Sequence, residues 1–113
     1  MSDRGRHAES LAAAFLQQQG LKLVARNYRC RFGEIDLIAR DGKTLVFIEV
    51  RMRTSDGYGG AAASITAAKR DKLLRTARHY LARTARAPAC RFDALLISGA
   101  DNTVEWLKNA FGE

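Results

Sequence analysis

Residues 33–53 read GEIDLIARDGKTLVFIEVRMR, and the fold depends on this stretch. Apolar residues alternate over residues 35–39, and an unbroken apolar run fills residues 45–48. Asp41-Gly42 lies between these two segments. An Asp-Gly pair in this setting predicts a tight hairpin turn, because glycine adopts positive φ at little cost. The stretch therefore predicts two antiparallel strands joined at Asp41-Gly42.

Acidic residues interrupt both predicted strands. A two-residue loop at Asp41-Gly42 would place Glu34 opposite Glu49 and Asp36 opposite Phe47. Because side chains alternate between the two faces of a strand, one face would then carry Glu34, Asp36, Phe47, Glu49 and Arg51. A one-residue slip would separate these residues. Like charges that face each other repel, so the pattern predicts a positive partner, either a divalent cation or Arg51.

The alternative interpretation is an ordinary solvated sheet face on which arginines pair with the acids. The second strand, however, is hydrophobic enough to be central in a sheet. Central strands seldom place charges at two successive positions of one face, since charged residues are rarely buried without a partner. The carboxylates therefore indicate a functional site.

Asp36, a hairpin and then Glu49-Val50-Arg51 resemble the motif of the restriction-endonuclease-like, or PD-(D/E)xK, nuclease superfamily. That motif is Asp, a spacer, an acidic residue, any residue and Lys. The wider sequence is similar to the YraN-like family of small bacterial endonuclease-related proteins. Four segments carry this resemblance in the family's order: GEIDLIARDG, LVFIEVRMR, YGGAAASIT followed by Lys69, and RFDALLI. Arg51 departs from the superfamily by replacing the catalytic lysine.

The resemblance implies an α/β fold with a restriction-endonuclease-like core, in which helices flank a central mixed β-sheet. It also implies metal-dependent phosphodiester hydrolysis. Asp36 and Glu49, with the backbone carbonyl of Val50, would hold Mg²⁺ or Mn²⁺, which prefer oxygen ligands. Arg51 stays protonated and cannot act as a base, but it could orient water or stabilise charge on the phosphate.

Three further residues could extend this site. Glu34 shares the predicted face with the acidic pair. Glu9 lies beside the apolar stripe of a predicted helix over residues 4–19, where the resemblance implies a glutamate that approaches the metal; a solvated helix-face acid is the alternative. Lys69 follows the third matching segment and could replace the missing lysine.

Periodicity predicts the remaining elements as a second helix and three more strands. The helix begins at a cap, Ser64 or Thr66, and runs to about Ala85; the strands cover residues 21–29, 91–98 and 103–107, before a short C-terminal turn. The predicted order is α-β-β-β-α-β-β. A chain of 113 residues is large enough for one hydrophobic core, so residues 1–113 are expected to form a single nuclease-like domain. Asp93 has no acidic neighbour in the sequence and is predicted to be structural.

Positive charge is concentrated in the second predicted helix. The chain carries +7, and the segment from Lys69 to Arg86 has seven basic residues against one acidic residue, or +6. Such concentration is typical of a surface that binds a polyanion, although many basic helices are merely solvated. The residues predicted to contact nucleic acid are Lys69, Lys72, Arg75, Arg78 and Tyr58. Tyr58, in a glycine-rich loop, would stack on a base; packing against the domain is its alternative.

No apolar run is long enough to span a membrane, and the N-terminus has no apolar signal segment. Cys30 and Cys90 lack metal-ligand spacing and suggest reduced thiols in a cytoplasmic protein, with a disulfide between them as the alternative. The expected partner is nucleic acid, with DNA favoured over RNA, and a homodimer is left open. Two other functions compete with the nuclease: a catalytically weak or inactive nucleic-acid-binding protein with a nuclease fold, and a protein-interaction domain whose acidic face meets a basic partner.

Overall fold

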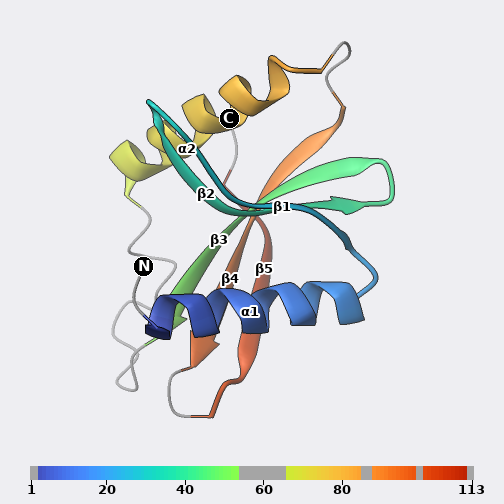
Figure 1. Cartoon of the computed structure of the whole chain (residues 1–113), viewed down its shortest axis with the longest axis vertical. Coiled ribbons are helices and arrows are strands. Elements are labelled where there is room, and N and C mark those ends of the chain that lie inside the picture. Colours follow the sequence, from blue (N-terminus) through green and yellow to red (C-terminus); the bar gives the residue numbers. More distant parts are fainter. Residues whose placement is uncertain (1–2, 54–65, 85–87, 99–100, 112–113) are drawn as a thin grey trace.

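A computed structural model describes residues 3–53, 66–84, 88–98 and 101–111. Figure 1 shows two helices and five strands in the predicted order. Their bounds are α1 Asp3–Gln18, β1 Lys22–Cys30, β2 Gly33–Asp41, β3 Thr44–Arg53, α2 Ala67–Leu81, β4 Cys90–Ser98 and β5 Val104–Phe111. The predicted α/β class with a mixed sheet is confirmed. Neither helix is long and apolar enough to cross a membrane within these ranges.

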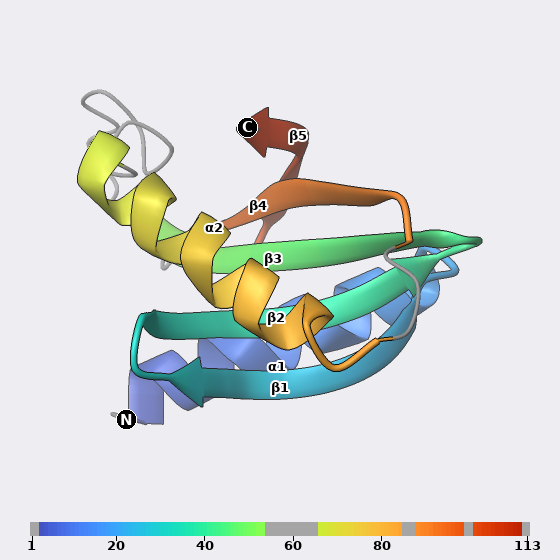
Figure 2. The same cartoon turned by 90° about the horizontal axis from the view of Figure 1, so that it is seen from above.

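The five strands form one sheet in the order β1-β2-β3-β4-β5. Neighbouring strands are antiparallel except β3 and β4, which are parallel. Parallel neighbours need a crossover connection, and α2 lies in the segment that makes it. Figures 1 and 2 show α1 and α2 on opposite faces of the sheet. Strand β3 is therefore central and covered on both sides, whereas β1 and β5 are the edges.

Each helix covers its own hydrophobic core. The core under α1 includes Ala12 and Leu16 of the helix with Val46 and Ile48 of β3. The core under α2 includes Leu73 and Ala77 of the helix, and its members from the sheet are Ile35, Ile38, Leu45, Phe47, Phe92 and Ala94. Because alternate residues of β3 enter the two cores, its unbroken apolar run is that of a strand buried on both faces.

The β2–β3 turn differs from the prediction by a shift of two residues in the pairing. Asp41 pairs with Thr44 and remains in the ladder, so Gly42 and Lys43 form the loop. Gly42 alone supplies the positive φ, 60°, at the first loop position. Asp41 is held in the strand by an ion pair of 2.9 Å with Arg91. The predicted pairings of Glu34 with Glu49 and of Asp36 with Phe47 are therefore wrong.

The shift leaves the predicted clustering of the acids possible, because an even shift does not exchange the two faces of a strand. Phe47 itself packs in the core under α2, stacked on Phe92 with ring centroids 5.3 Å apart.

Two element ends also differ from the prediction. Helix α2 ends at Leu81, and the chain tightens beyond it, where Thr84 N–H and its hydroxyl both donate to the Leu81 carbonyl. Strand β5 runs to Phe111 instead of ending near residue 107 in a turn. At the start of α2, Thr66 is the cap, and its hydroxyl oxygen accepts a 3.2 Å hydrogen bond from Lys69 N–H; Ser64 lies outside the described residues.

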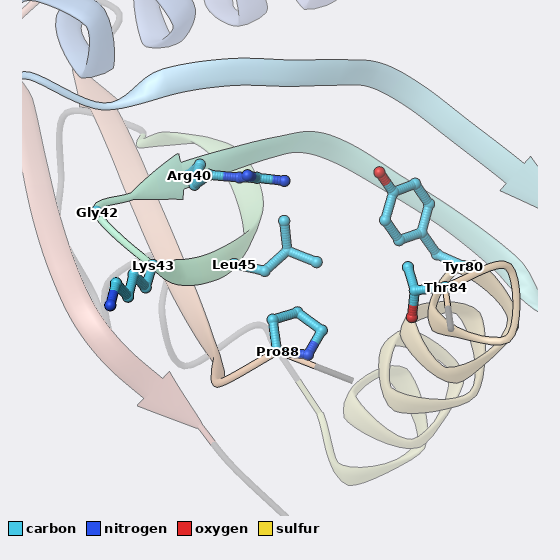
Figure 3. Close-up of a pocket in the computed structure, with 7 residues that line it drawn as sticks. All are labelled: Arg40, Gly42, Lys43, Leu45, Tyr80, Thr84 and Pro88. Atoms are coloured by element: carbon cyan, nitrogen blue, oxygen red, sulfur yellow. The ribbon is translucent and has the colours of Figure 1, made fainter. Parts of the chain in front are cut away.

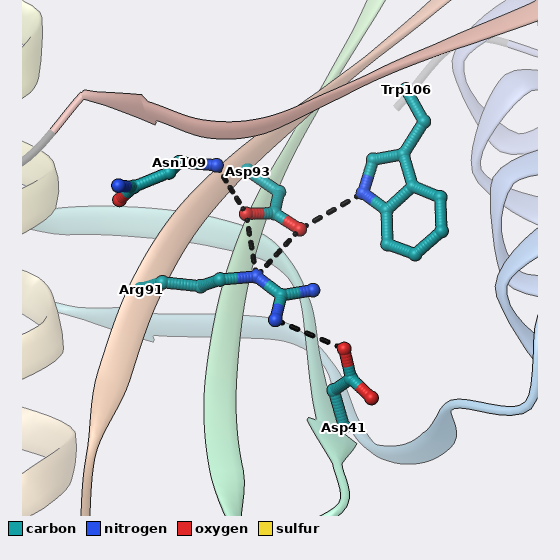
Figure 4. A network of polar contacts seen from close by, with 5 residues as sticks. All are labelled: Asp41, Arg91, Asp93, Trp106 and Asn109. Atoms are coloured by element: carbon teal, nitrogen blue, oxygen red, sulfur yellow. Dashed lines mark hydrogen bonds and ion pairs between the residues drawn. The ribbon is translucent and has the colours of Figure 1, made fainter.

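Strand β5 continues because Asp93 supports an irregularity in its pairing with β4. The register shifts between Phe92 and Ala94, and Asn109 in β5 has a φ of 55°. The fully buried Asp93 carboxylate accepts hydrogen bonds of 2.9 Å from Asn109 N–H and from Trp106 Nε1–H (Figure 4). The same carboxylate binds Arg91 Nε at 3.0 Å. The prediction that Asp93 is structural is confirmed.

Candidate active site

A cavity of about 280 Å³ collects the residues that the sequence singles out for chemistry. Its lining comes from α1, β2, β3 and α2: Ala8, Glu9, Glu34, Asp36, Glu49, Val50, Arg51, Met52 and Lys69. All seven residues predicted for catalysis, metal binding or extension of the site are in this set. The cavity lies where β2 and β3 leave their regular ladder, whose last pair before it is Leu37 with Ile48.

Asp36, which is half-buried, and Glu49, which is buried, form the acidic pair of the site. Asp36 Oδ2 accepts a 2.9 Å hydrogen bond from Val50 N–H, which fixes the carboxylate against β3. Glu49 is only 8% exposed. Burial, together with the neighbouring Asp36 carboxylate, raises the pKa of Glu49 to about 9. Glu49 is therefore protonated at neutral pH and hydrogen-bonded to Asp36 when no cation is present.

Arg51 is the positive group nearest to this pair. Its Nε lies 3.9 Å from Glu49 Oε1, and the guanidinium opposes the rise in the Glu49 pKa without cancelling it. Arg51 Nε is buried and has no hydrogen-bond partner within the described part of the chain. A buried donor without an acceptor is costly, so the site is suited to an incoming acceptor such as a phosphate oxygen.

Two more acids stand beside the pair. Glu9 is 8% exposed, so the alternative that it is a solvated helix-face acid is wrong. Burial raises the pKa of Glu9, and the nearby Asp36 and Glu34 charges raise it further, against a hydrogen bond from Asn27. Glu34 lies at the edge of the site, where it accepts a hydrogen bond from Arg29 Nε.

Asn27 in β1 belongs to the site although the sequence interpretation missed it. The β1–β2 pairs on either side place Asn27 across from Asp36. Its φ of 52° is left-handed, and its side chain bonds to Glu9. Asn27 Oδ1 is buried with no partner among the residues that the structure covers. An asparagine between strand-forming residues was the only available signal, since asparagine tolerates this conformation better than most residues.

The predicted nucleic-acid contacts lie along α2. Lys69 is half-buried and lines the cavity, whereas Lys72, Arg75 and Arg78 are exposed. Arg75 is paired at 3.1 Å with Asp71, one helical turn earlier. Tyr58 lies outside the described residues, so its predicted stacking remains a prediction.

The acidic pair fits a hard divalent cation. No group of three or more His, Cys, Asp or Glu side chains is arranged to hold a metal within the described ranges. Mg²⁺, however, commonly takes only one or two carboxylates and completes its shell with water and substrate phosphate. Asp36 and Glu49 supply two adjacent carboxylates, and a cation there would replace the proton that burial otherwise retains on Glu49.

Comparison with known proteins finds similarity over nearly the whole chain. The model of a family described as "Uncharacterised protein family UPF0102" matches residues 8–97. A UPF0102 protein of Nitrosomonas europaea is 64% identical over 112 residues, covering 98% of this chain and 95% of that protein. A UPF0102 protein of Aeromonas hydrophila is 50% identical over 111 residues, with 96% and 84% covered. The matched residues include every described residue that lines the cavity.

Proposed function

Since the chain belongs to UPF0102, the YraN family, whose description states no activity, we propose its function from the site itself. We propose that the protein is a metal-dependent nuclease that hydrolyses phosphodiester bonds in nucleic acid, with DNA as the first substrate to test. One observation carries the proposal: the buried Glu49 and the half-buried Asp36 share a cavity with Arg51 and with Lys69 at the start of a basic helix.

Asp36 and Glu49, with the backbone carbonyl of Val50, would hold Mg²⁺ or Mn²⁺. When bound, the ion would polarise the scissile phosphate and lower the pKa of a bound water. The protein's part begins with Asp36, whose hydrogen bond to Val50 N–H keeps one carboxylate oxygen in place and leaves the other available. Glu49 must release its proton before it can act as a ligand, because protonated carboxyls are poor metal ligands.

The cationic residues would act on the phosphate. Arg51 Nε donates no hydrogen bond to the described residues, so it can donate directly to a phosphate oxygen and stabilise negative charge in the transition state. Lys69, which lines the cavity from α2, adds a second positive group. Glu9, fixed by Asn27, provides a further acceptor for a water in the site.

The test is a cleavage assay on labelled duplex DNA, single-stranded DNA and RNA with Mg²⁺ or Mn²⁺. Asp36→Asn and Glu49→Gln should each abolish cleavage but leave binding in EDTA intact or tighter. Asp36→Asn removes a negative charge near phosphate, and Glu49→Gln replaces a side chain that is already uncharged without metal. Asp71→Asn is the matched control, since Asp71 is an exposed acid on α2. Equal cleavage by the wild type and both site variants would refute the proposal.

One observation favours a second function, a nucleic-acid-binding protein of weak or no catalytic activity. Arg51 cannot accept a proton, unlike the lysine that the superfamily motif places there. Arg51→Lys separates the two functions. A nuclease limited by this arginine should keep or gain activity as Arg51→Lys and lose it as Arg51→Ala. A wild type that binds DNA and cleaves nothing with either metal would support the binding protein.

A further inference from the structure

A second pocket, of about 300 Å³, lies at the other end of α2. Figure 3 shows Arg40 of β2 reaching across it toward Tyr80 and Thr84 at the end of the helix, while Lys43 lies at its rim beside the β2–β3 turn. The pocket is lined chiefly by Arg40, Lys43, Leu45, Tyr80, Thr84 and Pro88. No described residue lines both this pocket and the acidic cavity.

The positive charge of this pocket has no ion-pair partner among the described residues. Arg40 and Lys43 are exposed, and neither has an ion pair within the part of the chain that the structure describes. The one carboxylate between them, Asp41, is already held by Arg91 at 2.9 Å. Two cations beside an acid that already has an ion-pair partner form a site that attracts an anion.

The floor of the pocket is apolar and fixed. Leu45 is 4% exposed and belongs to the core under α2. The Tyr80 ring is held edge-on against Phe47, with centroids 6.1 Å apart, and edge-on against Tyr28 at 5.1 Å. Pro88 adds a further apolar surface. The ligand that suits this arrangement carries an anionic group for the two cations and a flat apolar body for the floor.

Helix α2 connects the two sites. Lys69, in its first turn, lines the acidic cavity, and Tyr80 and Thr84, at its other end, line the basic pocket. At 1.5 Å per residue this separation along the helix is roughly 20 Å. Stacked nucleotides advance about 3.4 Å each along one strand, so roughly six nucleotides would span the distance. The exposed cations of α2 lie between the two sites.

We propose that the basic pocket binds one nucleotide of a nucleic-acid strand that follows α2, with its phosphate on Arg40 and Lys43 and its base against Leu45 and Pro88. This inference rests on the proposed function in one respect, since it takes nucleic acid as the partner. It adds a binding site about six nucleotides from the position of cleavage.

Binding is tested by NMR on the full chain in EDTA, with deoxyadenosine monophosphate, deoxyadenosine and inorganic phosphate as separate probes. The monophosphate should shift the amide signals of Gly42, Lys43, Leu45 and Thr84 most strongly. The double variant Arg40→Ala/Lys43→Ala should weaken this binding by at least about fivefold, the effect of losing roughly one net charge-assisted contact. Lys22→Ala is the control: Lys22 pairs with Arg40 across the β1–β2 ladder but does not line the pocket.

Three outcomes would overturn the inference: shifts confined to the acidic cavity, equal responses to phosphate and to the monophosphate, or equal losses in Lys22→Ala and the double variant. The second outcome would leave a simple anion site. Because the probes are tested without metal and without cleavage, failure here leaves the nuclease proposal standing. Conversely, a chain that binds the monophosphate in this pocket but never cleaves DNA refutes only the nuclease proposal.

Discussion

Glu49 shows how a single residue couples the site to the stability of the chain. Its pKa rises from an ordinary 4.5 to about 9 on folding, chiefly because the side chain is buried and then because Asp36 is beside it. Between these two pH values the folded state holds a proton that the unfolded chain has released. The contribution of Glu49 to stability is therefore fully present below pH 4.5 and is lost as the pH rises toward 9.

Glu49→Gln should remove this pH dependence, because the amide carries no titratable proton. In EDTA, the variant should match the wild type in free energy of unfolding near pH 4 and exceed it by at least about 1 kcal/mol near pH 8, since each unit of pKa shift corresponds to about 1.4 kcal/mol. Urea unfolding at a series of pH values measures the difference. Parallel pH profiles for the two proteins would show that Glu49 titrates normally.

The residues of the site differ in how far sequence could identify them. Asp36, Glu49 and Arg51 were found from their alternation and from a resemblance, because strand periodicity fixes the face of a side chain within one hairpin. The burial of Glu9 was not predictable, since it depends on how closely α1 packs on the sheet. Asn27 was missed because its left-handed backbone and its bond to Glu9 exist only in the folded chain.

At the scale of elements, β5 depends on one buried carboxylate. Asp93 binds Arg91, Trp106 and the backbone of Asn109, and it has no exposed surface. Asp93→Ala should lower the free energy of unfolding by about 3 kcal/mol, because it leaves buried donors unpaired and creates a cavity. Asp71→Ala, which removes an exposed ion pair with Arg75, should cost less than about 1 kcal/mol. Urea denaturation compares the two, and equal effects would contradict the role given to Asp93.

If α2 contacts phosphates, DNA binding should weaken as the salt concentration rises. Each phosphate that the protein neutralises on duplex DNA contributes about 0.9 to the slope of log affinity against log salt. Lys72→Ala should flatten the slope by roughly one such unit and weaken binding equally across sequences. Arg75→Ala should change it less, because Asp71 already offsets part of that charge. Fluorescence anisotropy between about 50 and 200 mM salt measures the slopes; binding that ignores salt would exclude a phosphate-contacting helix.

Element ends were predicted less well than element types. The apolar periodicities identified all seven elements in order. The β2–β3 turn was misplaced because the ion pair between Asp41 and Arg91, from a distant strand, keeps Asp41 in the ladder. Strand β5 was predicted too short because Asp93, on the neighbouring strand β4, stabilises the irregularity in the β4–β5 pairing. In both cases a long-range polar contact overrode the local signal.

For the molecule as a whole, metal binding should raise the free energy of unfolding. If Asp36 and Glu49 hold Mg²⁺ or Mn²⁺ only in the folded state, the ion should add about 2.7 kcal/mol at a free concentration about a hundred times its Kd. The gain should be larger at pH 8 than at pH 6, because Glu49 must lose its proton to bind metal. Thermal unfolding with each ion tests this expectation. Glu49→Gln should show little gain, and a gain equal to that of the wild type would place the metal elsewhere.

For the whole molecule, the order of the elements was predictable from local periodicity, and the helices that flank the sheet were implied by the family resemblance. The two cavities were not. The acidic one needs α1, β2, β3 and α2 to converge, and the basic one needs the end of α2 to meet the β2–β3 turn. Such convergence is set by the packing of whole elements, for which a single sequence carries no direct signal.

The parallel pairing of β3 with β4 has a consequence for how the chain folds. It joins Leu45 to Cys90, far along the chain, whereas Asp36 and Glu49 come from a hairpin of adjacent residues. Hairpins close within microseconds, but distant pairings must first overcome loop-closure entropy and form slowly. The two carboxylates therefore meet early in folding, while water still solvates them. The cost of burying Glu49, which must take up a proton at neutral pH, arises only when the helices and β4 close over the hairpin, so it should speed unfolding more than it slows folding.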